Sequence, residues 1–191
     1  MSALVDRAAL ESVFHPDELV TLTEATLVVV AHEPTRVFLR DVGLPDQVGW
    51  FEVAQDLLDG DIRIGGPAWQ AVAARHPRCP YDMSTWLTLG GIGMDDVVVD
   101  VATGIVYCVP EDGGPHLLNS SVDALAFFLR ELEKERPEYD PEAATDEGVD
   151  PDGAADRLLR RMRSADPSAV ADPESSWYAV LRLVRRLLQS Y

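Results

Sequence analysis

The chain has 191 residues, of which 47% are hydrophobic, and it carries 33 Asp and Glu against 16 Lys and Arg, a formal net charge of −17. This length suits one domain, residues 1–191, with a sizeable core, and the charge excludes nucleic acid and anionic membranes as favoured partners. No apolar run approaches the roughly 18 residues that cross a bilayer, and the first residues lack a signal-peptide pattern. With only Cys79 and Cys108 present, no disulfide framework is expected, and we predict a cytoplasmic protein.

The first 80 residues predict short helices and short extended segments. Helices are expected over 2–14, over 34–42 with Gly43 as the residue after the helix end, and over 66–76 between Pro67 and Pro77. Extended segments are expected over 19–30, 50–53 and 62–64. The stretch near 66–81 is expected to be a helical insertion.

The central part, 85–133, predicts successive strands and then a helix. Strands are expected over 85–89, 97–101, 105–109 and 116–118, and a turn at Asp100–Gly104 makes the second and third an antiparallel hairpin. Ser120 and Asp123 form the pattern of a capping box. The helix that follows has apolar residues at helical spacing: Val122, Leu125, Ala126, Leu129 and Leu132.

The C-terminal part begins with an acidic stretch. Between Glu131 and Asp152 there are ten Asp and Glu but two Lys and Arg, which predicts a flexible acidic segment near 137–156. Helices are expected over 156–163 and 175–190. The predicted fold class is therefore α+β, a mostly antiparallel sheet packed with helices from both ends of the chain.

No catalytic or cofactor motif stands out, and no cofactor is expected. Gly90-Gly91-Ile92-Gly93 matches neither phosphate-binding fingerprint and is interpreted as a turn with close backbone approach. Asp95, Asp96 and Asp100 lack the calcium-loop pattern, and no histidine lies in a metal-type pair. A small metal-dependent hydrolase built on these aspartates and a histidine is the remaining enzymatic alternative.

Several segments, taken in order, resemble the SUKH superfamily (SMI1/KNR4-like), most closely its SUKH-4 immunity proteins. They cover roughly 32–133: 34–45 (Pro-Thr-Arg-Val-Phe-Leu-Arg-Asp-Val-Gly-Leu-Pro), Trp50-Phe51, the 87–90 strand, the hairpin containing Thr103-Gly104, Val-Pro-Glu-Asp-Gly-Gly, Leu118-Asn119-Ser120-Ser121 and Phe127-Phe128-Leu129. The helix from Trp177 matches the family's C-terminal helix. The 66–81 stretch and the long acidic segment depart from the pattern.

The resemblance implies a non-enzymatic scaffold that binds and neutralises a cognate polymorphic toxin, often a basic nuclease or nucleic-acid deaminase. The acidic charge is consistent with such a partner, although it can also serve solubility alone. The candidate contact residues are Trp86, Asp95, Asp96, Glu111 and Asp112, although burial in the core is the usual role of a Trp. An adaptor of the same fold with a partner other than a toxin is the alternative.

Overall fold

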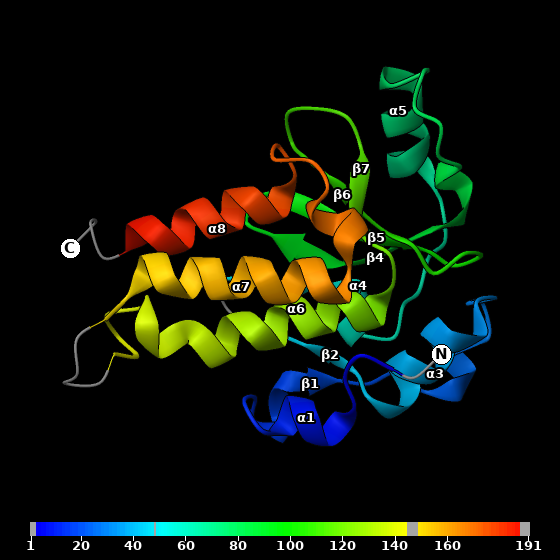
Figure 1. Ribbon diagram of the computed structural model, residues 1–191. Coiled ribbons are helices and arrows are strands. Elements are labelled where there is room, and N and C mark those ends of the chain that lie inside the picture. Colours follow the sequence, from blue (N-terminus) through cyan, green and yellow to red (C-terminus); the bar gives the residue numbers. More distant parts are fainter. Residues whose placement is uncertain (1–2, 48, 145–148, 188–191) are drawn as a thin grey trace.

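The computed structural model of the chain describes residues 3–47, 49–144 and 149–187. Its centre is a five-stranded antiparallel sheet in the order β3 (Glu52–Val53), β4 (Trp86–Ile92), β5 (Asp95–Asp100), β6 (Val106–Val109) and β7 (His116–Asn119). The helices α6 (Val122–Glu135), α7 (Pro151–Ala165) and α8 (Ser176–Arg186) lie together over one face of this sheet (Figure 1). The α+β class predicted from the sequence is confirmed.

The β5–β6 hairpin follows the predicted turn. The Asp100 carboxylate accepts hydrogen bonds from the Ala102 amide at 2.9 Å and the Thr103 hydroxyl at 2.8 Å. Gly104 has φ +79°, and a Cβ at this position would lie 2.2 Å from Nδ1 of His32. Only glycine therefore fits where the turn packs against the start of α3 (Glu33–Asp41).

Helix α6 begins one residue later than the capping box predicted. The Ser121 hydroxyl, not that of Ser120, accepts the hydrogen bond from the Ala124 amide. The Asp123 carboxylate instead accepts from the amides of Leu4 and Val5, at 2.8 and 3.1 Å. Asp123 thus fastens the N-terminal segment to α6, a long-range role that no local pattern predicts.

The N-terminal region is more irregular than predicted. It contains α1 (Arg7–Glu11), η1 (Pro16–Glu18), β1 (Leu19–Val20) paired with β2 (Leu44–Pro45), and α2 (Glu24–Leu27). The expectation of an extended segment through Val30 is wrong. Leu27 and Val30 are fully buried while Val28 and Val29 are 75% and 42% exposed, which is helical spacing instead of strand alternation. The predicted strand at 62–64 is a single bridge between Ile64 and Leu87.

The opposite face of the sheet has its own small core. Side chains of β4, β5 and β6 point there and pack with α5 (Pro67–Arg75) and η2 (Met83–Thr85). A further short helix, α4 (Gln55–Leu58), follows β3 in the chain. This second core consists of buried Trp69, Val72, Met83, Trp86, Val98, Tyr107 and Val109. The predicted helix within 66–76 is present as α5, and it covers part of a sheet face.

The acidic stretch after Glu131 is more ordered than its composition suggests. Glu131 and Glu135 lie inside α6, a short turn η3 (Arg136–Glu138) follows, and α7 begins at Pro151, while 145–148 lie outside the described residues. Beyond η4 (Pro167–Val170), α8 ends at Arg186, and the rest of the helix expected to reach residue 190 lies mostly outside the described residues.

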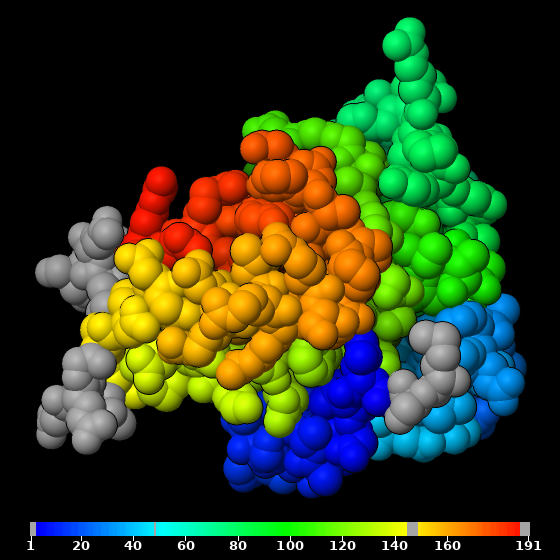
Figure 2. Space-filling model, in the orientation of Figure 1, coloured from blue at the N-terminus to red at the C-terminus, as the bar shows by residue number. Residues whose placement is uncertain are grey.

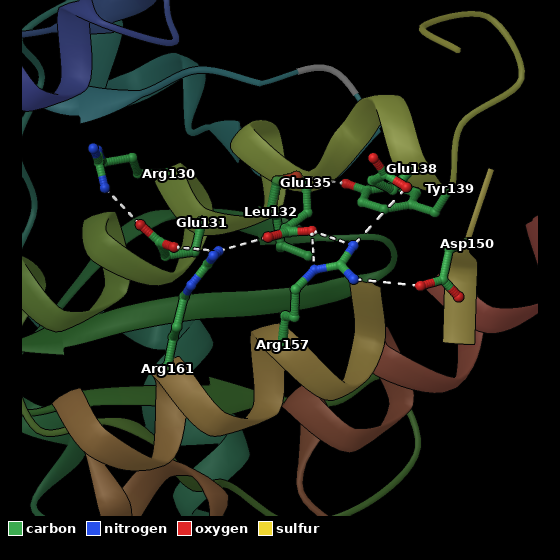
Figure 3. A network of polar contacts seen from close by, with 9 residues as sticks. All are labelled: Arg130, Glu131, Leu132, Glu135, Glu138, Tyr139, Asp150, Arg157 and Arg161. Atoms are coloured by element: carbon green, nitrogen blue, oxygen red, sulfur yellow. Dashed lines mark hydrogen bonds and ion pairs between the residues drawn. The ribbon is translucent and has the colours of Figure 1, made fainter. Parts of the chain in front are cut away.

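A network of ion pairs joins α6 to α7 (Figure 3). The Glu131 carboxylate, 3% exposed, accepts from Arg130 at 2.5 Å and from Arg161 at 2.9 Å. The Glu135 carboxylate accepts from Arg161 at 2.7 Å and from Arg157 at 2.9 Å. Each carboxylate oxygen of this pair therefore has a guanidinium partner, which is what buried charge requires.

Candidate partner-binding surface

Four of the predicted contact residues lie at one end of the sheet. Asp95 and Asp96 are the first two residues of β5, and Asp96 pairs with Val109 of β6. Glu111 and Asp112 follow Val109 closely and therefore lie at the same end of the sheet. The Glu111 amide donates a hydrogen bond to the Asp95 carboxylate at 3.3 Å. Antiparallel register thus brings together carboxylates that are about fifteen residues apart in the sequence.

A fifth carboxylate comes from β3, at the edge of the sheet. Glu52 of β3 pairs with Gly91 of β4, which in turn pairs with Asp96 of β5, and the Glu52 side chain is exposed. We call Glu52, Asp95, Asp96, Glu111 and Asp112 the acidic rim. Sequence reasoning missed Glu52 because only the β3–β4 register, which closes a long loop, places it there.

A groove of about 340 Å³ lies beside the rim. Glu52, Asp95 and Asp96 line it together with apolar and small residues: Gly49, Trp50, Val53, Ala54, Thr88, Gly90, Gly91, Gly93 and Met94. Met94, at the tip of the β4–β5 turn, is 79% exposed. The half-buried Trp50 packs edge-on against Tyr139, with ring centroids 6.0 Å apart.

Glycine at position 90 allows β3 and β4 to meet at this groove. A Cβ there would lie 2.1 Å from the Glu52 carbonyl oxygen and 2.9 Å from the Phe51 ring. The backbone approach predicted for 90–93 is therefore found at Gly90, but Gly90 and Gly91 belong to β4 and the turn itself comes at Gly93 and Met94.

The electrostatics of the rim favour a cationic partner. No rim carboxylate forms an ion pair within the part of the chain that the structure describes. Partial burial raises the pKa of Asp96, and the neighbouring charge of Asp95 raises it further. A Lys or Arg side chain placed between these two carboxylates would relieve that repulsion.

Trp86, the fifth predicted contact residue, lies below the surface. Its side chain is fully buried, stacked on Tyr107 at a centroid distance of 5.2 Å and edge-on to Trp69 at 5.7 Å. In this conformation it offers no area to a partner and belongs to the core under α5. β-strand alternation puts it on the opposite face from Leu87 but does not reveal that α5 covers it.

The aspartates and histidines of the alternative hypothesis, a metal-dependent hydrolase, do not lie together. Asp100 lies at the far end of β5 from Asp95 and Asp96 and is engaged in its own turn. Nε2 of His116 lies 2.8 Å from the Ser176 hydroxyl, but its Nδ1 faces the Gly114 carbonyl oxygen at 3.4 Å instead of a carboxylate. Within residues 3–47, 49–144 and 149–187, no three His, Cys, Asp or Glu side chains are grouped as metal ligands.

Comparison with known proteins places the chain in a family. The model of the SUKH-4 immunity protein family matches residues 5–183, nearly the whole chain. Searches of curated proteins and of solved structures give no match. In addition, none of the helices formed by the described residues has the length and apolar character needed to cross a membrane. The chain therefore belongs to the SUKH-4 immunity protein family.

Proposed function

We propose that this SUKH-4 family member is a non-enzymatic cytoplasmic immunity protein that neutralises a cognate toxin by binding it through the acidic rim. The proposed toxin surface is basic, as expected for a nuclease or nucleic-acid deaminase, whose substrate-binding face must attract phosphates. The immunity protein would occupy that face in place of the nucleic acid.

The convergence of the rim supports this proposal more than any other observation. Five carboxylates from β3, β5 and the β6–β7 loop lie near one another, three of them (Glu52, Asp95 and Asp96) line one groove, and none is neutralised by a neighbouring cation among the described residues. Some other acidic side chains of the protein are neutralised internally, as Glu131 and Glu135 are. Unpaired like charges are unfavourable in the free protein, and a cationic partner would remove that cost.

The proposal also assigns a role to the exposed Met94. A protein interface needs an apolar centre as well as charge, and Met is among the residues enriched at contact surfaces. Met94 and Trp50 provide apolar area within the rim. The expected occupant is thus a protein segment in which basic side chains flank an apolar one.

The test is capture of the product of the neighbouring gene by the wild-type protein and by a variant with a neutralised rim. The variant carries Glu52→Gln, Asp95→Asn, Asp96→Asn, Glu111→Gln and Asp112→Asn. We expect its affinity to fall by about 10-fold or more at low salt, with most of the change in the association rate, and its protection against toxicity to fall with it.

A matched control separates the rim from total charge. The control neutralises five exposed carboxylates outside the rim: Asp17, Glu33, Asp59, Glu142 and Glu174. Equal losses in both variants would show that only the net charge matters and would reject the rim as the contact surface. Failure of the wild-type protein to capture or neutralise the neighbouring product, with capture of a host protein instead, would favour an adaptor.

A further inference from the structure

A pocket lined by two arginines, Arg75 and Arg78, lies near the acidic rim. Most described arginines bind a carboxylate or a carbonyl oxygen, as Arg40, Arg157 and Arg161 do. Arg75 and Arg78, at the end of α5, are both exposed, and the structure records no ion pair or hydrogen bond for either guanidinium among the described residues. In a protein of net charge −17, two neighbouring unpaired arginines are unexpected.

The two arginines share a pocket of about 420 Å³. Its walls are the chain from Arg75 to Tyr81 and, opposite, Gly114 and Pro115 of the β6–β7 loop. No carboxylate is among its lining residues, so the pocket supplies no counterion for either arginine. Proline and tyrosine side chains make the remaining wall stiff and mostly apolar.

The pocket and the acidic rim share the β6–β7 loop. Glu111 lies at the rim end, where its amide binds Asp95, and Gly114 lies at the pocket end, against the ring of His76. Three residues of extended chain span at most about 11 Å, so a single partner surface reaches both sites. The loop therefore separates an anionic surface from a cationic one.

We infer that the partner carries an acidic side chain, Asp or Glu, that enters the Arg75–Arg78 pocket while its basic residues lie on the acidic rim. This inference rests on the proposed function and adds the second half of the recognition. Two guanidiniums with unused donors match a carboxylate in geometry and charge.

A bipolar surface also performs a task that uniform negative charge does not. A uniformly acidic face attracts any basic protein, whereas neighbouring charges of opposite sign fix one orientation and reject partners with the wrong pattern. The rim would supply attraction and rapid encounter, and the pocket would supply discrimination among basic toxins. Nucleic acid is a poor occupant, because its phosphates would be repelled by the adjoining rim.

The first test compares two double variants of equal net charge. Arg75→Glu/Arg78→Glu reverses the charge of the pocket, and Lys134→Glu/Arg160→Glu reverses two exposed cations elsewhere whose side chains form no ion pair or hydrogen bond with the described residues; each pair moves the net charge from −17 to −21. Affinity for the neighbouring gene product is measured by titration. We expect the pocket variant to bind at least about 10-fold more weakly than wild type, and the control to bind as well or better.

Equal affinities for the two double variants would overturn the inference while leaving the proposed function intact, because the wild-type protein would still bind. Absence of binding by the wild-type protein would reject both. Arg75→Gln/Arg78→Gln, which introduces no new acid at the helix end, guards against loss of folding and is expected to weaken binding to a smaller degree.

Labelling of Cys79 tests independently whether the partner covers the pocket. It is half-buried in the pocket wall, whereas the only other cysteine, Cys108, is fully buried and burial raises the pKa of its thiol to about 12. A maleimide should therefore label Cys79 selectively in the folded protein. We expect saturating partner to slow this labelling severalfold, and an unchanged rate in the complex would show that the pocket stays open and overturn the inference.

Discussion

The indole of Trp86 lies between the rings of Tyr107 and Trp69, and its Nε1 has no hydrogen-bond acceptor among the described residues. Trp86→Ala should therefore reduce the free energy of unfolding by about 3–5 kcal/mol, because it empties the core beneath α5. Trp86→Phe keeps the ring stacking, loses no hydrogen bond and should cost under about 2 kcal/mol. Urea unfolding measures both values.

Partner binding distinguishes this structural role from a contact role. If Trp86 supports the surface from beneath, folded Trp86→Phe should bind the partner within about twofold of wild type. A large loss of affinity with unchanged stability would mean that the indole becomes exposed and touches the partner.

At the same scale, the raised pKa of Asp96 predicts how binding depends on pH. A raised pKa means that Asp96 takes up its proton at a higher pH than an ordinary aspartate, and so loses its charge first as the solution is acidified. A cationic partner favours the ionised form, so binding releases that proton, and as the pH is lowered from neutral into the acidic range the affinity should begin to fall before an ordinary aspartate takes up its proton.

Affinity measured across that pH range checks this prediction. Asp95 is the charged neighbour that raises the pKa, and Glu52 lines the same groove. The Asp96→Asn variant should bind more weakly at neutral pH and show a smaller loss on acidification. An identical pH profile for this variant would assign the titration to another group.

At the scale of elements, the Glu131–Arg161–Glu135 bridge determines how firmly α7 is held on α6. Arg161→Met removes one cation shared by two buried carboxylates and should destabilise the protein by about 3 kcal/mol. Arg160→Met, at the exposed neighbouring position, should change stability by no more than about 0.5 kcal/mol. Thermal unfolding of both variants measures the difference, and equal effects would contradict the role given to the network.

These elements also show which features a sequence reveals. The β5–β6 hairpin and the helices α3 and α6 were predicted because their signals are local: alternation, a turn with its aspartate and glycine, and an apolar stripe. Glu131 and Glu135 were counted in the acidic stretch between Glu131 and Asp152 and not as ion-pair partners, since their arginines lie 30 and 22 residues later. Spacing within a short window cannot report such pairing.

The candidate surface likewise contains residues that the sequence predicted and residues that it did not. The strand pattern placed Asp95, Asp96, Glu111 and Asp112 at neighbouring strand ends, whereas Glu52 required the register of a two-residue strand. The unpaired state of Arg75 and Arg78 could not be predicted, because pairing of an arginine depends on which carboxylates the fold brings near it.

At the scale of the whole molecule, the net charge of −17 conceals two populations of carboxylates. Some are neutralised internally and hold helices together, as Glu131 and Glu135 do, while those of the acidic rim have no internal cation among the described residues. Only the second population contributes fully to the field that a partner meets. Figure 2 shows the segments of α6 to α8 (yellow-green to red) packed together on one side of the molecule, with the α5 region (teal) projecting at the upper right.

The last helix completes the core around residues made much earlier. Trp177 of α8 is 1% exposed, packs on Phe128 and donates a hydrogen bond to the Leu118 carbonyl oxygen, 59 residues before it. At roughly 5–20 residues per second, a ribosome needs about 3–12 s to make that stretch. During this time the core around Leu118 and Phe128 lacks Trp177, so the part of the sheet beneath α8 is covered only after translation has passed this helix.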